Sequence, residues 1–119
     1  MSISIICYKS KNIIYLNLGD IINPEDGIIQ LNKLNELVLE SDNKALILVN
    51  AKKFMPGRNF MEIASQTLYK RSPNIIKAAY IGIENYNKKL YDQYDKFNMK
   101  KVNRKNFDDE ESALLWLIE

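Results

Sequence analysis

The chain has 119 residues, of which 46% are hydrophobic and 27% are charged, and its formal net charge is +2. These values are typical of one soluble globular domain, residues 1–119, with a core of ordinary size. The chain has no histidine, which excludes histidine-activated nucleophiles, histidine general bases and histidine metal ligands.

The first residues, MSISIICYK, lack the basic start and the long apolar run of a signal peptide. No stretch approaches the roughly 20 apolar residues that a membrane span needs. We therefore expect a cytoplasmic protein. Cys7 is the single cysteine, and its position in an apolar strand predicts a small buried thiol, with a redox role as the alternative.

A β-hairpin and a helix are predicted in the first third of the chain. Alternating residues define one face of each hairpin strand: Ile3, Ile5 and Cys7 in the first, and Ile14, Leu16 and Leu18 in the second. Asn23 then supplies an N-cap and Pro24 the first helical position, so we expect a helix over residues 24–41. Its buried stripe, at spacings of three and four, is Ile28, Leu31, Leu34 and Val38.

Two apolar runs follow, over residues 45–49 and 75–83, the second with Lys77 as its only charge, and they predict strands covered on both faces. The segment between them has apolar residues at helical spacing, and Ser72-Pro73 should end that helix. The apolar positions are Phe60, Ile63, Ala64, Thr67 and Leu68. Strand, helix and strand in this order imply a parallel pair with a right-handed crossover.

A third helix is predicted over residues 85–97, with Leu90, Tyr94 and Phe97 buried. Residues 102–107 form a charged strand that suits a sheet edge. In the closing FDDEESALLWLIE, Asp108 should cap a last helix with Glu111 in a capping box, and Trp116 should seal that helix onto the sheet. The order is therefore ββαβαβαβα, an α/β domain on a small mixed sheet of four to five strands.

This order resembles the STAS-like family, especially its small SpoIIAA-like members related to bacterial anti-sigma-factor antagonists. The segments that carry the resemblance are GDIINPED, ALILVN, KAAYIGI and FDDEESALLWL, which span nearly the whole chain. The resemblance implies an intracellular, non-enzymatic, regulatory module that docks on other proteins, often a kinase or a sigma-factor regulator.

The chain departs from the family at one motif. Signalling members present a phosphorylatable serine after the third strand, in an Asp-Ser-Ser-Gly-like segment. Matching Phe54-Met55 to the end of that loop brings Pro56, Gly57, Arg58 and Asn59 onto the motif, and none of them can accept a phosphate. We therefore expect constitutive binding here, without a phosphoserine switch.

The candidate site lies where LILVNAKKFMPGRNF, residues 46–60, runs from a strand into a helix. Ligands of open α/β sheets bind beyond the carboxyl ends of parallel strands, so loops 50–58 and 82–89 should lie there together. A helix N-terminus adds unpaired N–H groups that favour an anion. The candidate partner or anion contacts are Asn50, Lys52, Lys53, Gly57, Arg58, Asn59, Glu84 and Tyr86. The alternative is a plain turn with solvated cations.

We rank four functions. A non-enzymatic protein-binding or regulatory module is first, with an unidentified protein or a second copy of the chain as its partner. A small-ligand module for a lipid or an anionic metabolite at the strand ends is the alternative. Nucleic-acid binding is third and rests on ten Lys or Arg against three acids in residues 69–107, from Lys70 to Lys105, a stretch that a solvated surface also explains.

An enzyme is fourth, because acid pairs such as Asp92 with Asp95 occur only at exposed helical spacings. No cofactor and no metal are expected, and the acidic run at residues 108–111 is assigned to the helix start.

Overall fold

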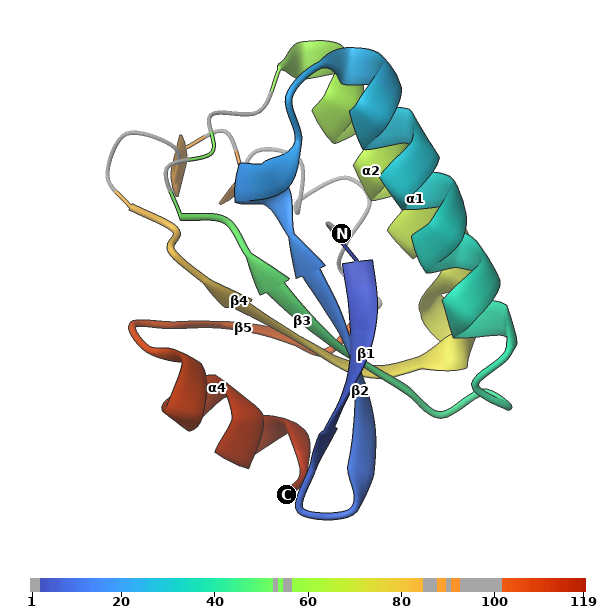
Figure 1. Cartoon of the computed structure of the whole chain (residues 1–119), viewed down its shortest axis with the longest axis vertical. Coiled ribbons are helices and arrows are strands. Elements are labelled where there is room, and N and C mark those ends of the chain that lie inside the picture. Colours follow the sequence, from blue (N-terminus) through green and yellow to red (C-terminus); the bar gives the residue numbers. More distant parts are fainter. Residues whose placement is uncertain (1–2, 53, 55–56, 85–87, 90, 93–101) are drawn as a thin grey trace.

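Five strands form one mixed sheet whose spatial order follows the chain, β1-β2-β3-β4-β5 (Figure 1). The computed structural model describes residues 3–52, 54, 57–84, 88–89, 91–92 and 102–119. β1 (Ile3–Tyr8) pairs antiparallel with β2 (Lys11–Asn17). β3 (Ala45–Asn50), β4 (Ile75–Ile81) and β5 (Arg104–Phe107) continue from β2 in parallel. The predicted α/β class and mixed sheet are confirmed.

Helices cover both faces of the sheet. α1 (Pro24–Leu39) and α2 (Arg58–Arg71) lie on one face, and α4 (Glu110–Leu117) lies on the other (Figure 1). Two short 3-10 helices, η1 (Leu18–Asp20) and η2 (Ser72–Asn74), join the elements. None of the helices in the described ranges is long and apolar enough to cross a membrane.

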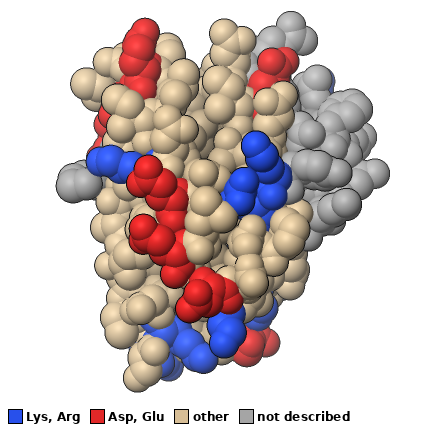
Figure 2. All heavy atoms as spheres, turned by 90° about the vertical axis from the view of Figure 1, so that its right-hand side faces the viewer, with Lys and Arg blue, Asp and Glu red and all other residues tan. Residues whose placement is uncertain are grey.

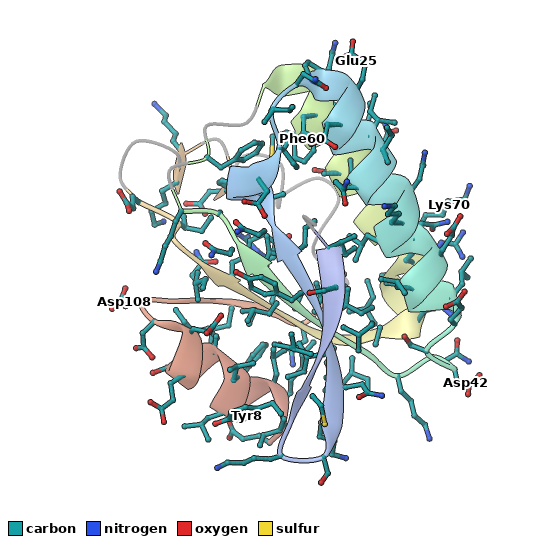
Figure 3. All side chains as sticks on the ribbon, viewed as in Figure 1. Tyr8, Glu25, Asp42, Phe60, Lys70 and Asp108 are labelled. Carbon is teal, nitrogen blue, oxygen red and sulfur yellow. The ribbon has the colours of Figure 1, made fainter. Side chains whose placement is uncertain are left out.

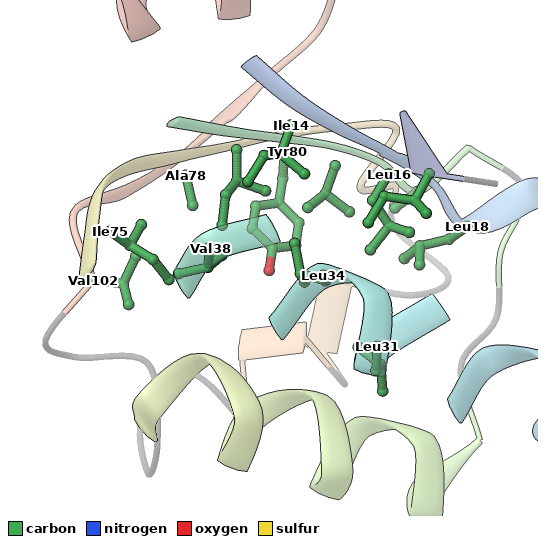
Figure 4. Close-up of a cluster of buried hydrophobic side chains, with 14 of the residues drawn as sticks. Ile14, Leu16, Leu18, Leu31, Leu34, Val38, Ile75, Ala78, Tyr80 and Val102 are labelled. Carbon is green, nitrogen blue, oxygen red and sulfur yellow. The ribbon is translucent and has the colours of Figure 1, made fainter. Parts of the chain in front are cut away.

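The core has two parts because the central strands are covered on both faces, as their continuous apolar sequence predicts. Between the sheet and α1, Leu34 lies against Tyr80 of β4, and Leu31 and Val38 of α1 belong to the same buried cluster (Figure 4). The second part, under α4, is formed by Ile13, Leu46, Leu48, Ala79, Ile81, Ala113, Leu114 and Leu117.

The start of α1 is as predicted, and so is the burial of Leu31, Leu34 and Val38, but one residue of the predicted stripe is wrong. Asn23 Oδ1 accepts a hydrogen bond from the Asp26 N–H at 2.8 Å, and Pro24 opens the helix. Ile28 is 40% exposed, so its predicted burial is wrong, and Gly27 takes the buried position. The reason is close helix packing: a Cβ on Gly27 would lie 2.9 Å from Phe60 Cδ2 of α2.

The hairpin is confirmed, but the predicted burial of Cys7 is wrong. Lys9 and Ser10 form its two-residue turn, both with positive φ, as the right-handed strand twist favours. Cys7 is exposed, and so is its cross-strand partner Asn12. β1 is an edge strand, and helix cover does not reach this end of it.

Later boundaries shift by a few residues. α2 ends at Arg71, directly before Ser72-Pro73, as predicted. β4 ends at Ile81 because Gly82 turns the chain with φ +81°, and β5 begins at Arg104 and is an edge strand as expected.

The helix predicted over residues 85–97 falls mostly outside the described residues, and so do Leu90, Tyr94 and Phe97. The described residues 88–89 and 91–92 are helical. Lys88 and Lys89 are exposed, and Lys88 Nζ lies 2.7 Å from Asp92 Oδ2. Tyr91, which the sequence did not single out, is buried with its ring edge-on to Tyr80.

The last helix begins one residue later than predicted. Asp109, and not Asp108, is the N-cap: its Oδ1 accepts from the Ser112 N–H at 2.8 Å and its Oδ2 from the Ser112 hydroxyl at 2.9 Å. The acidic run is a helix start, as predicted. Trp116 seals the helix onto the sheet through Phe107, with ring centroids 5.5 Å apart.

Candidate binding surface at the strand ends

The carboxyl ends of β2, β3 and β4 meet at one end of the sheet, beside the amino-terminal ends of α1 and α2 (Figure 1). The chain leaves these strands at η1, at Ala51 and at Gly82. The Ala51 N–H donates to the Ile81 carbonyl at 2.8 Å, so the loops after β3 and β4 lie side by side. This is the arrangement that parallel strands predict.

Gly82 fixes how closely these two loops approach. Its φ of +81° lies in the region that favours glycine. A Cβ at this position would lie 2.4 Å from the Lys52 backbone nitrogen and 2.7 Å from the Lys52 Cα. The backbone that presents Lys52 is therefore held against the end of β4.

Asn50 has an internal role. Its Nδ2 donates to the Tyr15 hydroxyl at 3.0 Å, and its Oδ1 accepts from the Lys52 N–H at 3.1 Å. Both ends of the amide are therefore engaged within the chain. Asn50 shapes the loop after β3, and its amide would have to leave these bonds to reach a partner.

An open groove of about 490 Å³ lies beside this loop. It is lined by Ile21, Ile22, Asn23, Pro24, Phe54, Gly57, Asn59 and Phe60. Ile22 is 85% exposed, the largest exposed fraction among the large apolar side chains of the described residues. Phe54 and Phe60 pack edge to face at 5.3 Å, and Figure 3 shows Phe60 near the first turns of α1 and α2. The floor of the groove is thus aromatic and its rim carries Ile22.

We call the groove residues together with Lys52 the strand-end surface. Lys52, Gly57 and Asn59 are exposed there, and so is Glu84 at the end of the loop after β4. Exposed Asp20 lies in the connection between β2 and α1, and exposed Glu25 lies in the first turn of α1, so the surroundings of the surface are of mixed charge. Lys53, Tyr86 and the side chain of Arg58 lie outside the described part of the chain.

Sequence reasoning placed the loops but missed the groove. Ile21, Ile22, Phe54 and Phe60 belong to it, and none of them was a candidate contact. A usable signal was present in Ile22, a large apolar residue in a polar turn immediately before an N-cap. Ile22 belongs to neither the apolar face of the predicted strand nor that of the predicted helix. Nothing in the sequence therefore predicts an element that would cover it.

An apolar cavity of about 30 Å³ lies between the sheet and the two helices of its face. Leu16, Leu34, Val49, Met61 and Tyr80 are among its lining residues, together with the buried Ser65. This volume holds about two water molecules and is far below the several hundred Å³ of a small-molecule pocket. A cavity of this volume is too small for a lipid chain.

The described basic residues between Lys70 and Lys105 are dispersed and mostly engaged. Lys77 Nζ donates to the Trp116 carbonyl at 2.7 Å, Lys88 pairs with Asp92, and the Arg104 guanidinium lies 4.1 Å from the Tyr80 ring centroid. On the side of the molecule that Figure 2 shows, acidic and basic side chains are interspersed. Neither observation describes a basic face for nucleic acid.

Comparison of the chain with protein-family models, with curated proteins and with solved structures gives no match. The resemblance to the STAS-like family stays a prediction. Within the described ranges, no three His, Cys, Asp or Glu side chains gather closely enough to hold a metal ion.

Proposed function

We propose that the protein is a non-enzymatic binding module whose protein partner docks on the strand-end surface. The observation that carries the proposal is the 85% exposure of Ile22 at the rim of an open groove with an aromatic floor. Large apolar side chains grouped on a surface mark sites of protein interaction. The STAS-like resemblance supports the same type of function.

The rim supplies polar contacts around the apolar groove. Lys52 and Asn59 are exposed beside it, and Lys53 and Arg58 add positive charge in the same loop by sequence. A partner segment with an apolar anchor and an acidic neighbour would match this arrangement, because complementary charge speeds association and fixes orientation. Residues 54–59 offer no serine, so the proposed binding is constitutive.

Binding of a small lipid or anionic metabolite ranks below this proposal. The cavity of about 30 Å³ under the helices is too small for such a molecule, so it would have to bind in an open hollow of the surface, such as the groove at Ile22. A thermal-shift panel of lipids and nucleotides tests this alternative, since a ligand at about 100 times its Kd stabilises by roughly 2.7 kcal/mol.

The proposal is tested by affinity capture from host extract with matched baits. Ile22→Asp removes the apolar rim, and a Lys52→Glu, Lys53→Glu, Arg58→Glu variant reverses the basic loop. The controls are Ile29→Asp, at a residue 52% exposed on α1, and a Lys9→Glu, Lys11→Glu, Lys44→Glu variant at the opposite end of the sheet. Proteins that bind the wild type and both controls, but neither strand-end variant, are the expected partners. Equal capture by all baits would place the contact elsewhere.

A further inference from the structure

The two edges of the sheet have different chemistry. β5 forms one edge with the sequence RKNF, and charged residues there discourage pairing with other strands. β1 forms the other edge with the sequence ISIICY, which contains no charge and no proline. Among the described residues β1 pairs with β2 alone. An apolar, regular edge strand of six residues is a template for a further strand.

The register of the hairpin shows which backbone N–H and C=O groups of β1 are not bonded to β2 and could pair with another strand. Tyr8 lies opposite Lys11 across the two-residue turn, and the pair next to such a turn is hydrogen-bonded. Because hydrogen-bonded and non-hydrogen-bonded pairs alternate, the N–H and C=O groups of Ile3, Ile5 and Cys7 point away from β2. They form a regular row of donors and acceptors along the outer edge.

The side chains of these residues leave apolar surface along the same edge. Ile3 is buried, whereas Ile5 is 48% exposed and Cys7 is exposed. Ile5 also lines an open hollow of about 450 Å³, together with apolar residues such as Ile14 and Leu37 and charged residues such as Lys11 and Glu40. Apolar surface and unpaired backbone therefore coincide at Ile5.

We propose that β1 pairs antiparallel with β1 of a second copy of this chain, around a twofold axis at Ile5. A twofold axis perpendicular to a sheet makes an edge strand antiparallel to its own copy. Both copies then use the same surface in the contact. Facing residues must share a face of the sheet, which places Ile5 opposite Ile5 and Ile3 opposite Cys7 of the other copy. The facing pairs that would bond across the new edge, Ile5 with Ile5 and Ile3 with Cys7, are then apolar, and such pairs stabilise neighbouring strands.

A second copy fits this edge better than an unrelated strand because the pattern is self-complementary. Centring the axis on Cys7 instead would set Lys9 opposite Ile5 and would leave Ile3 without a facing residue in the strand. Centring it on Ile5 keeps Lys9 and Lys11 outside the paired segment. The sheet would then continue through both copies, and the exposed Ile5 side chains would cover each other.

The mass in solution tests the proposal. Light scattering after size exclusion, across a dilution series of the wild type, should give twice the monomer mass at high concentration and a decline on dilution. Ile5→Lys brings two like charges together at the axis and should give the monomer mass throughout. Ile76→Lys, at a residue 47% exposed on β4, is the matched control and should dimerise like the wild type. A monomeric wild type overturns the proposal, and so does a dimer that Ile5→Lys leaves intact.

Cross-linking tests the register independently. In the proposed dimer the two copies of residue 5 have Cα atoms about 5.5 Å apart, whereas the two Cys7 residues are offset by about 14 Å along the strands. A short bis-maleimide should link an Ile5→Cys, Cys7→Ser variant and should link the wild type at Cys7 poorly. Circular dichroism confirms that each variant is folded. Efficient linkage at Cys7 with little at residue 5 overturns the proposed register.

Discussion

Lys77 of β4 joins the last helix to the sheet through Trp116. Its Nζ donates to the Trp116 carbonyl at 2.7 Å and lies 4.8 Å from the centroid of the indole ring. The ammonium group therefore satisfies a carbonyl in the last turn of α4, where a positive charge is favourable, and also contacts an aromatic face. This contact explains why the otherwise apolar run of β4 contains a lysine.

Replacing Lys77 by methionine should lower the free energy of unfolding, because it weakens the contact between α4 and the sheet. Lys77→Met keeps an apolar stem of similar length but removes the charged donor from the Trp116 carbonyl, which then keeps only backbone donors such as the Glu119 N–H at 3.3 Å. Because hydrogen bonds to charged groups contribute about 1.5–3 kcal/mol and Lys77 is only half-buried, we expect a loss of about 1.5 kcal/mol in the free energy of unfolding. Urea denaturation followed by Trp116 fluorescence measures it.

Lys105→Met is the matched control for this prediction. Lys105 lies on the neighbouring strand, is exposed, and has its Nζ 5.3 Å from the Phe107 ring centroid. Its replacement should change the free energy of unfolding by less than about 0.5 kcal/mol, as is usual for surface substitutions. Equal losses in the two variants would show that the bond to Trp116 adds nothing to stability.

The fold could be predicted wherever a local pattern has one structural solution. The apolar run at 45–49 indicated a covered strand, and Asn23-Pro24 before an apolar stripe at helical spacing indicated a helix start. The predictions were wrong where the burial of a residue depends on an element that is distant in the sequence. Gly27 is buried and Ile28 exposed because Phe60 approaches α1 at Gly27, and the exposure of Cys7 depends on how far the helices extend over β1. Neither neighbour is adjacent in the sequence.

Gly82→Ala should be strongly destabilising, whereas Gly57→Ala should not. An alanine at residue 82 combines a positive φ with a Cβ 2.4 Å from the Lys52 nitrogen, and backbone cannot move aside cheaply. Strain of this kind costs on the order of 1–3 kcal/mol. A Cβ on Gly57 meets nothing within 4 Å, so its change should stay within about 0.5 kcal/mol. Thermal unfolding of both variants gives the comparison, and an unchanged midpoint for Gly82→Ala would contradict the close approach of the loops.

Asp109→Ala should destabilise the protein more than Asp108→Ala. The Ser112 backbone N–H and, secondarily, the Ser112 hydroxyl hold the pKa of the Asp109 carboxyl below its usual value. A lowered folded-state pKa means that the stabilisation is present above the unfolded-state pKa, about 3.9, and is lost as the pH falls through the folded-state pKa. The stability difference between wild type and Asp109→Ala should therefore shrink in strong acid. Urea titrations at several pH values measure it, and a larger effect of Asp108→Ala would restore the capping role that the sequence predicts for Asp108.

The candidate site was less predictable than the fold. Parallel strand order places the loops after β3 and β4 together without any knowledge of side chains, and the bond from Ala51 to Ile81 confirms it. Tertiary packing decides which of the side chains in these loops are free to contact a partner. Asn50 is engaged by Tyr15, 35 residues away in the chain, and the groove at Ile22 exists only because Phe54 and Phe60 pack beside the start of α1.

Tyr80 should make the protein unstable in alkaline solution. Burial raises the pKa of the Tyr80 phenol, and the nearby Arg104 guanidinium opposes this by a smaller amount. A raised folded-state pKa means that the stabilisation is complete below the unfolded-state pKa of about 10 and is lost as the pH rises toward the folded-state value. The free energy of unfolding should fall by at most about 1.4 kcal/mol per pH unit on this account. Urea titrations of Tyr80→Phe should show a shallower decline above that pH than those of the wild type. Parallel declines in the two proteins would mean that the alkaline transition has another origin.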